Sequence, residues 1–414
     1  MALADLTGWL DEHAGLNSIW YVKRLSGNDT LANRTHQAGP YIPRDFLLSI
    51  FPSLNQPETL NPDTRFHLYI DSHADYRLAR AVWYNNKLHG RTRDETRFTN
   101  LGGTSSALLD PDNTGALSVF AFVLNEKRLA TECHVWVCEH GTEEDLIEDR
   151  IGPVEPGKWT IWSPHHEPVP SLFQPVPGTS VSCWLEPEEI PSQWLVQFPT
   201  GAQIIEKSVE LRPDESLDPD RRLLRRRECE FELYRSVEEA VELPVISAGF
   251  RSIDDFIARA QTILQRRKAR SGRSLELHTR SIFMEEGLRE NQDFDYGVEA
   301  EPGRRPDFLF PSLDAYRNMS FPANRLRMLA VKTTCKDRWR QVLNEADRIA
   351  KKHLLTLQEG VSEGQFREMA DAGVQLVVPK PLSKSFPASV RPHLLTLESF
   401  IGDVRLLHME DSPR

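Results

Sequence analysis

The periodicity of the sequence changes across a proline-rich stretch in its middle, and this change restricts the chain to folds with two dissimilar domains. Residues 164–177 contain five prolines, a density that neither a helix nor a central strand tolerates. A chain of 414 residues is also too long for one ordinary hydrophobic core. We therefore predict a first domain over residues 1–172, a linker over 173–183 and a second domain over 184–408.

The first half reads as short strands. Runs at residues 66–70, 116–124 and 134–137 are rich in β-forming residues and are separated by Asn, Asp, Gly and Pro. Such spacing is typical of an all-β barrel or sandwich with little helix.

The second half changes to helical spacing and then alternates helices with strands. Ser252 is placed to cap a helix through about residue 267, and a second helix is expected from Ser274. We expect strands at residues 308–310, 326–334 and 374–378, and a helix at about 336–353. Helices alternating with strands indicate an α/β layer.

Composition is that of a globular protein. Hydrophobic residues make up 39% and charged residues 27%, so the chain can bury a core without metals or disulfides. The first residues carry an early acid and no basic segment, and the longest apolar run is too short to cross a bilayer, so we expect a cytoplasmic protein with no membrane partner. The cysteines are few, odd in number and scattered, which predicts reduced thiols: Cys133, Cys138, Cys183, Cys229 and Cys335.

The net charge of −11 argues against a protein that coats nucleic acid indiscriminately, because phosphate binding depends on Lys and Arg. Any DNA binding must be local. Basic residues do gather at 221–227 and at 266–273. Either cluster is as consistent with a solvated helix face as with a DNA contact.

Two motifs in the second half could support phosphodiester hydrolysis. Asp307 directly precedes an apolar strand, and Lys332 ends the apolar run of the next strand. This is the outline of the PD-(D/E)XK nuclease core, in which carboxylates hold Mg²⁺ and a cation lies near the attacking oxygen or the phosphate. The same two motifs also occur by chance in α/β proteins.

An acid is missing from this outline. Ala330 occupies the position two residues before Lys332, and alternation along a strand puts both side chains on one face. We expect Glu345, on the helix predicted at 336–353, to substitute for that acid, so that Asp307 and Glu345 bind the metal. Glu276, on the preceding helix, is a further candidate carboxylate.

Two charge triplets could read base pairs. Lys336, Asp337 and Arg338 follow the lysine strand, and Lys or Arg can donate to guanine while an acid accepts from cytosine N4. The alternative is a helix N-terminus whose dipole Asp337 complements. The second triplet lies in the first domain and shares one face if it forms a strand: Arg93, Glu95 and Arg97. Further DNA-binding candidates there, which could equally be ordinary barrel surface, are Lys23, Asn28, His36, Tyr41, Arg80 and Lys87.

A zinc site in the segment from Cys133 to His140 is not expected. On a strand Cys133 and Cys138 point to opposite faces, and His134 and Cys138 lie about 13 Å apart at the usual rise per residue, too far to share one tetrahedral ion.

Several long segments resemble the EcoRII-like family of type IIE restriction endonucleases. They are YVKRLSGNDT at 21–30, DNTGAL at 112–117, RSLELH at 273–278, PDFLFP at 306–311 and LAVKTTCKDRWRQ at 329–341. The resemblance spans nearly the whole chain. It implies an N-terminal B3-like pseudobarrel effector domain that binds DNA, followed by an α/β PD-(D/E)XK catalytic domain.

The resemblance also implies an activity. Such an enzyme is a homodimer that cleaves both strands of a CCWGG-like site with Mg²⁺, leaves 5′-phosphates, and engages two or more copies of the site in double-stranded DNA. Its effector domain inhibits cleavage until it binds a further site, and a cognate methyltransferase acts on the same site without a stable complex.

The family's catalytic aspartate, lysine and glutamate fall on Asp307, Lys332 and Glu345, and its CC:GG-reading segment falls on residues 336–338. Members flip a base out of the duplex, and we assign the pocket for that base to Arg227 and Phe231.

Two other classes of function remain open. One is a DNA-binding regulator with an inactive nuclease fold, which the missing acid at Ala330 favours. The other is a repair or structure-specific nuclease, which would not need base-reading triplets.

Overall fold

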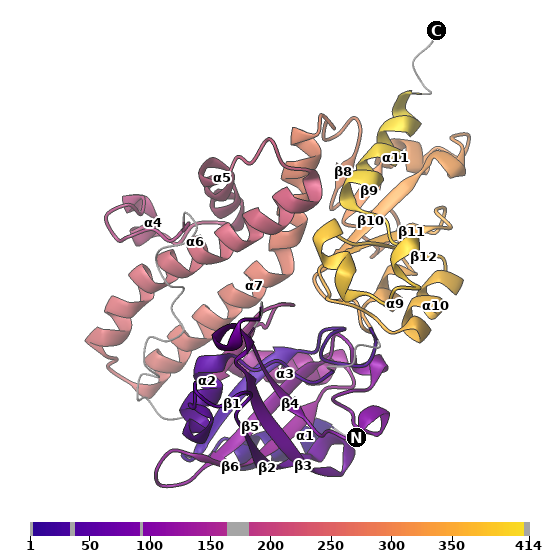
Figure 1. The fold of residues 1–414 in the computed structure, drawn as a ribbon. Coiled ribbons are helices and arrows are strands. Elements are labelled where there is room, and N and C mark those ends of the chain that lie inside the picture. Colours follow the sequence, from indigo (N-terminus) through magenta and orange to yellow (C-terminus); the bar gives the residue numbers. More distant parts are fainter. Residues whose placement is uncertain (1–2, 34–37, 92–93, 164–181, 410–414) are drawn as a thin grey trace.

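A computed structural model describes residues 3–33, 38–91, 94–163 and 182–409, and it divides the chain into a β-rich N-terminal domain and a C-terminal domain of helices around a second sheet (Figure 1). Most of the predicted linker at 173–183 lies outside the described residues. No helix within the described ranges has both the length and the apolar composition needed to span a bilayer.

The N-terminal domain is built on a seven-stranded sheet in the order β4-β3-β2-β6-β5-β1-β7. Its pairings are antiparallel except for β2 with β6, which run parallel. The strands are β1 (Ser18–Arg24), β2 (Asp63–Ile70), β3 (Asp75–Tyr84), β4 (Glu95–Thr99), β5 (Leu117–Leu124), β6 (Ala130–Val137) and β7 (Trp159–Trp162). The predicted strands coincide with parts of β2, β5 and β6.

Both faces of this sheet are buried at its centre. Tyr21 of β1 points into one core, which α2 (Arg44–Ile50) covers, while its neighbours Trp20 and Val22 point into the other. Helices α1 (Leu3–His13) and α3 (Gly141–Ile151) cover that second face. The expectation of little helix was therefore too low, because a strand that is apolar on both faces requires a cover on each side.

The C-terminal domain begins with two short helices, α4 (Ser192–Val196) and α5 (Gly201–Leu211). They lie beside a pair of long helices, α6 (Pro219–Ala248) and α7 (Ile253–Glu285) (Figure 1). The hydroxyl of Ser252 accepts a hydrogen bond from the Asp255 amide, as expected of the cap. The two helices predicted after it are one, because nothing between them breaks the helix. Helix α6 was not predicted from the sequence.

The basic clusters of these helices face acids. Arg267 bonds to Glu238 and Arg270 bonds to Glu230, which join α7 to α6, and Arg226 bonds to Glu285. The helix pair is therefore held by ion pairs, and these arginines are not a free cationic surface.

One expectation about the cysteines is wrong. Cys183 and Cys229 form a disulfide, because the end of the predicted linker packs against α6. The other thiols, Cys133, Cys138 and Cys335, are free and buried. Cys133 lies in one core of the N-terminal domain and Cys138 in the other, which confirms that they point to opposite faces of the sheet.

The second sheet has five strands in the order β12-β11-β10-β9-β8. They are β8 (Asp295–Tyr296), β9 (Phe308–Phe310), β10 (Arg327–Lys332), β11 (Lys352–Thr356) and β12 (Val374–Val377). Strands β10, β11 and β12 are parallel, and β9 is antiparallel to β10. Helices α7 and α11 (Leu397–Met409) cover one face, while α9 (Trp339–Val342) and α10 (Glu363–Asp371) cover the other.

The helix predicted at 336–353 is mostly absent. Only α9 forms there, Ala346 has a positive φ of 50°, and Lys352 begins β11. The Lys352 ammonium donates to the carbonyl oxygens of Glu345 and Ala346, which would accept backbone N–H groups if the helix continued. Glu345 is therefore carried by a turn and not by a helix.

Candidate active site

Asp307 and Lys332 meet where β9 and β10 pair. Leu329 is opposite Phe308, and continuing this antiparallel register places Asp307 opposite Ala330. The Lys332 Nζ lies 3.4 Å from Asp307 Oδ2. The same oxygen accepts a hydrogen bond from the Val331 amide at 2.7 Å. Strand β10 therefore orients the Asp307 carboxylate, which lies opposite Ala330, the position where the expected acid is missing.

Glu345 belongs to the same cluster although it is not on a helix. Burial raises its pKa to about 7, with the Asp307 carboxylate adding to the rise and the Lys332 ammonium opposing it. Its Oε2 is buried and has no hydrogen-bond partner among the described residues. The structure thus brings together three of the four side chains predicted to be catalytic: Asp307, Lys332 and Glu345.

Glu276 approaches the cluster from α7. Burial raises its pKa, and the nearby Asp307 carboxylate raises it further. Its Oε2 accepts a hydrogen bond from the Tyr296 hydroxyl at 3.1 Å. Sequence reasoning missed Tyr296, since the two-residue strand β8 that carries it has no pattern to detect.

The donor set fits a hard divalent cation. Three carboxylates, Asp307, Glu345 and Glu276, gather around one lysine, and burial together with the Asp307 carboxylate raises the pKa of both glutamates. Oxygen ligands of this kind suit Mg²⁺ or a similar ion, and the unpartnered Glu345 oxygen is available to it.

The predicted base-reading segment is bonded to the N-terminal domain along its whole length. Lys336 Nζ donates to the Cys138 carbonyl oxygen at 2.7 Å, and Asp337 Oδ2 accepts from the Gly141 amide at 3.0 Å. Arg338 Nη2 lies 3.4 Å from Asp145 Oδ1. All of these partners lie on α3 or immediately before it.

A cavity of about 530 Å³ lies between the two domains at this point. Its C-terminal wall includes Glu276, Lys332 and Arg338, and its N-terminal wall includes the acidic residues Asp145, Glu148 and Glu155. The space next to the carboxylate cluster is therefore lined by charges of both signs, since Arg24 and Lys268 line it as well.

The predicted base-flip pocket is also filled from the N-terminal domain. Glu155 accepts from Arg227 Nη2 and from Arg270 Nη2, each at 2.6 Å. Although burial alone would raise its pKa, the two guanidinium groups hold the pKa of Glu155 at about 2. The Phe231 ring lies under Lys158, 5.8 Å from its Nζ.

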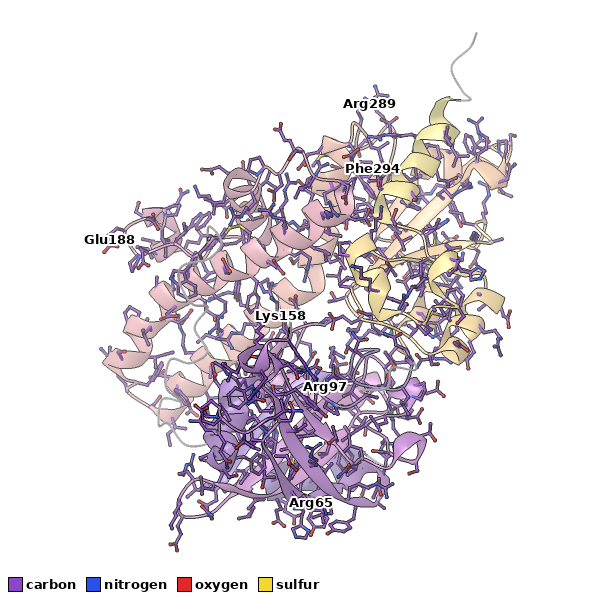
Figure 2. The ribbon with its side chains drawn as sticks, viewed as in Figure 1. Arg65, Arg97, Lys158, Glu188, Arg289 and Phe294 are labelled. Carbon is purple, nitrogen blue, oxygen red and sulfur yellow. A yellow bond between two sulfur atoms is a disulfide. The ribbon has the colours of Figure 1, made fainter. Side chains whose placement is uncertain are left out.

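The predicted effector-domain residues that the structure describes fall into two groups. Tyr41, Lys87 and Glu95 line a second cavity of about 360 Å³, and Arg97 donates to Glu95 Oε1 at 2.6 Å and to the Asn28 carbonyl oxygen. In Figure 2, Arg97 and Lys158 lie at the end of this domain nearest the C-terminal domain, and Arg65 lies at the far end.

The second group is paired elsewhere. Lys23 is buried in an ion pair with Asp29, and Arg80 bonds to Asp63. The remaining two, His36 and Arg93, lie outside the described residues.

Comparison with known proteins agrees with this arrangement. A family model described as "Restriction endonuclease EcoRII, N-terminal" matches residues 14–166, and one described as "EcoRII C terminal" matches residues 234–401. The chain is 43% identical to the type II restriction enzyme EcoRII of Escherichia coli over 414 residues, covering 99% of this chain and 100% of the relative.

Two solved structures are similar to parts of the chain. Metal-depleted Ecl18kI in complex with uncleaved DNA covers 56% of this chain and 87% of its own, with 19% identity and a TM-score of 0.44. The B3 domain of the UbaLAI restriction endonuclease with cognate DNA covers 38% of this chain and 97% of its own, with 19% identity and a TM-score of 0.27. The expected two-domain architecture is confirmed: a β-rich domain that matches the EcoRII N-terminal model is joined to an α/β domain that matches the EcoRII C-terminal model. The chain belongs to the EcoRII family of type II restriction endonucleases and is a site-specific deoxyribonuclease that binds DNA.

Proposed function

We propose that this enzyme makes double-strand breaks at a CCWGG-like site with Mg²⁺, and that its N-terminal effector domain inhibits cleavage until it binds a further copy of the site. The observation that carries the proposal is the carboxylate cluster of Asp307, Glu345 and Glu276 around Lys332, with the N-terminal domain bonded to the adjoining residues 336–338. A regulator with an inactive nuclease fold is less well supported, because Glu345 supplies a carboxylate close to the site and Ala330 has none to offer there.

In the proposed mechanism Asp307 and Glu345 hold the metal, with Glu276 as a further carboxylate. When bound, the ion would neutralise charge at the scissile phosphate and lower the pKa of water. Lys332 orients the attacking water and favours its deprotonation, and the proton passes to solvent. The hydroxide attacks phosphorus in line with the bond to the 3′-oxygen, that bond breaks, and the departing 3′-oxygen takes a proton from solvent. The products are 5′-phosphate and 3′-hydroxyl ends.

In the catalytic domain, specificity comes from three adjacent side chains. Lys336 and Arg338 donate to guanine O6 and N7, and Asp337 accepts from cytosine N4. A base flipped out of the duplex stacks on Phe231 beside Arg227. In the effector domain the second reading surface comprises Lys23, Asn28, His36, Tyr41, Arg80, Lys87, Arg93, Glu95 and Arg97.

Autoinhibition rests on steric and electrostatic grounds. Residues that would bind DNA are bonded to α3 and to Glu155, and the cavity beside Lys332 has an acidic wall. A polyanion cannot contact these residues until the domains separate, since their polar groups already bond to the N-terminal domain and carboxylates lie close to them.

The organisation of the active enzyme follows from the site. A near-palindromic sequence is cut on both strands by a homodimer, with domains over residues 1–172 and 184–408 joined by a linker at 173–183. The enzyme acts in the cytoplasm on two or more sites in double-stranded DNA, and a methyltransferase protects the same sites without forming a stable complex.

A plasmid with several CCWGG sites, incubated with the enzyme and Mg²⁺, tests the proposal. Discrete fragments that disappear with EDTA are expected. Binding without cutting would favour the inactive regulator, and cutting at unrelated sequences would contradict the assignment of residues 336–338. A plasmid with one site should be cut slowly, and rapid cutting of it would contradict autoinhibition.

A further inference from the structure

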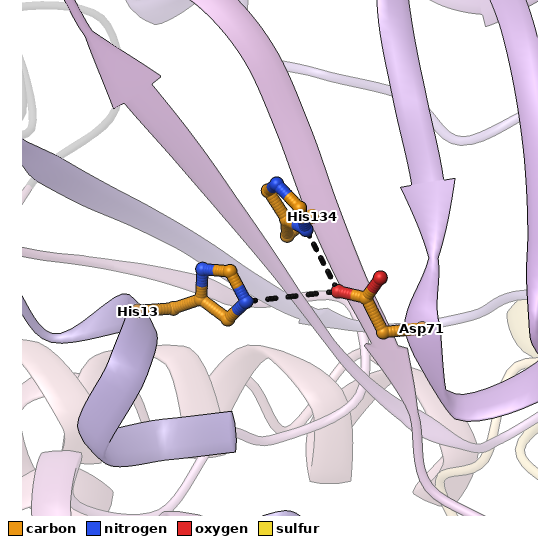
Figure 3. Close-up of side chains that lie close together, drawn as sticks. All are labelled: His13, Asp71 and His134. Carbon is orange, nitrogen blue, oxygen red and sulfur yellow. Dashed lines mark hydrogen bonds and ion pairs between the residues drawn. The ribbon is translucent and has the colours of Figure 1, made fainter. Parts of the chain in front are cut away.

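A cluster of two histidines and one aspartate lies in the N-terminal domain, apart from the carboxylate cluster. His13 ends α1, Asp71 begins the short 3-10 helix after β2, and His134 lies on β6. Figure 3 shows that one ring nitrogen of each histidine is directed at the same Asp71 oxygen. The His134 Nδ1 lies 2.9 Å from Asp71 Oδ2, and the His13 Nε2 lies 3.7 Å from it.

We propose that His13, Asp71 and His134 bind a divalent transition-metal ion of the Zn²⁺ class. Zinc takes imidazole nitrogen and carboxylate oxygen at 2.0–2.2 Å, so neighbouring donors around a tetrahedral ion lie about 3.3 Å apart. The two distances above bracket this value, and all of the donor atoms lie within 4.8 Å of one another. Two imidazoles with one carboxylate also favour a transition metal over Mg²⁺.

The surroundings supply outer contacts that metal ligands usually have. The Trp9 indole N–H donates to Asp71 Oδ2 at 2.6 Å, which orients the carboxylate. The Glu132 Oε1 lies 3.9 Å from His134 Nε2, on the side of the ring away from the cluster. The Tyr69 ring stacks on His134 with centroids 4.8 Å apart.

The cluster is accessible on one side. The side chain of His13 is 9% exposed, that of His134 19% and that of Asp71 28%. Three protein donors with one open side leave room for a water molecule as the fourth ligand. Because the donors come from segments distant in the sequence, the ion would fasten α1 and the Asp71 turn to β6.

The strand that carries His134 leads to the interdomain contact. Four residues further along the chain, the Cys138 carbonyl oxygen accepts from Lys336. The metal site therefore lies at one end of the segment that covers the base-reading residues, although it contributes nothing to the carboxylate cluster itself.

The test measures metal binding by the full-length chain, independently of cleavage. After chelation and dialysis, Zn²⁺ is titrated calorimetrically in excess Mg²⁺, which occupies the carboxylate cluster. We expect one Zn²⁺ per chain, and a loss of at least about tenfold in affinity in His13→Gln and His134→Gln. The matched control is His67→Gln, an exposed histidine of the same sheet, which should bind as the wild type does.

Cobalt substitution gives a second readout. Co²⁺ bound by the wild type should show the visible absorption of a tetrahedral site, and His13→Gln should lose it. Asp71→Asn, which keeps the shape of the side chain, provides an independent variant if a histidine variant loses its native circular dichroism. No stoichiometric Zn²⁺ in the wild type, or undiminished binding in the well-folded variants, would overturn the proposal and leave a simple His134–Asp71 ion pair.

Discussion

Glu155 is the residue at which the proposed autoinhibition can be tested most directly. Its carboxylate accepts from two arginines of the C-terminal domain and is only 12% exposed. We expect Glu155→Gln to weaken the docking of the two domains and to raise the rate of cleavage of DNA with a single site. Arg270 keeps a partner in Glu230 in this variant, so the helix pair should stay intact.

The pKa of Glu155 gives the magnitude. The docked state lowers it from 4.5 to about 2, and each unit corresponds to about 1.4 kcal/mol, so the charge contributes about 3 kcal/mol to docking. Losing that contribution would raise the population of separated domains by about a hundredfold. Because the docked pKa lies below the ordinary value, the contribution is complete above pH 4.5 and is lost as the pH falls toward 2. The effect of the variant should therefore not change between about pH 6 and 9.

The assay compares cleavage rates on a one-site and a multi-site plasmid. Glu155→Gln should cut the one-site plasmid much faster than the wild type does, and the two plasmids at similar rates. Asp149→Asn is the control, since it removes an exposed interdomain pair with Lys268 that contributes at most about 1 kcal/mol. A Glu155→Gln enzyme that folds normally and depends on a second site as strongly as the wild type would refute the reasoning.

Three further outcomes are expected. Lys332→Ala should keep DNA binding in a gel-shift assay but lose cleavage, and a variant that still cuts with Mg²⁺ would remove its assignment. Deletion of residues 1–180 should abolish the need for a second site, and a truncated enzyme that still requires one would contradict inhibition by that domain. Asp220→Ala should lower the free energy of unfolding by about 3 kcal/mol in urea, because the buried carboxylate accepts from the amides of Lys380, Leu397 and Glu398. Asp218→Ala, which removes a helix cap and an ion pair with the exposed Arg221, should cost about 1 kcal/mol, and an equal loss in both would argue against this role.

The nuclease strands could be predicted because their information is local. Side chains alternate along a strand, so the apolar runs around Phe308 and Leu329 identified β9 and β10. The same alternation placed Ala330 and Lys332 on one face, and Met328 and Ala330 do share one core of the domain. Asp307 and Lys332 then fall together as soon as the two strands pair.

Glu345 could be predicted as a participant but not as part of a helix. Its spacing to Gln341 and Ile349 is helical, yet the Lys352 ammonium takes the carbonyl groups that a longer helix would use. The disulfide between Cys183 and Cys229 was missed for a related reason, since 46 residues separate the two cysteines and only packing brings them together.

The sequence by itself determined the two kinds of domain, the strands of the site and the carboxylates and lysine that meet there, because backbone conformation follows from short-range patterns of apolar and polar residues. Only the tertiary structure decided which charges pair. In the two basic clusters, Arg226 faces Glu285, Arg227 faces Glu155, Arg267 faces Glu238 and Arg270 faces Glu230, and in the N-terminal domain His13 meets His134. Electrostatic and coordination energies depend on distances in space, and residues far apart in the chain acquire those distances only when the domains fold and dock.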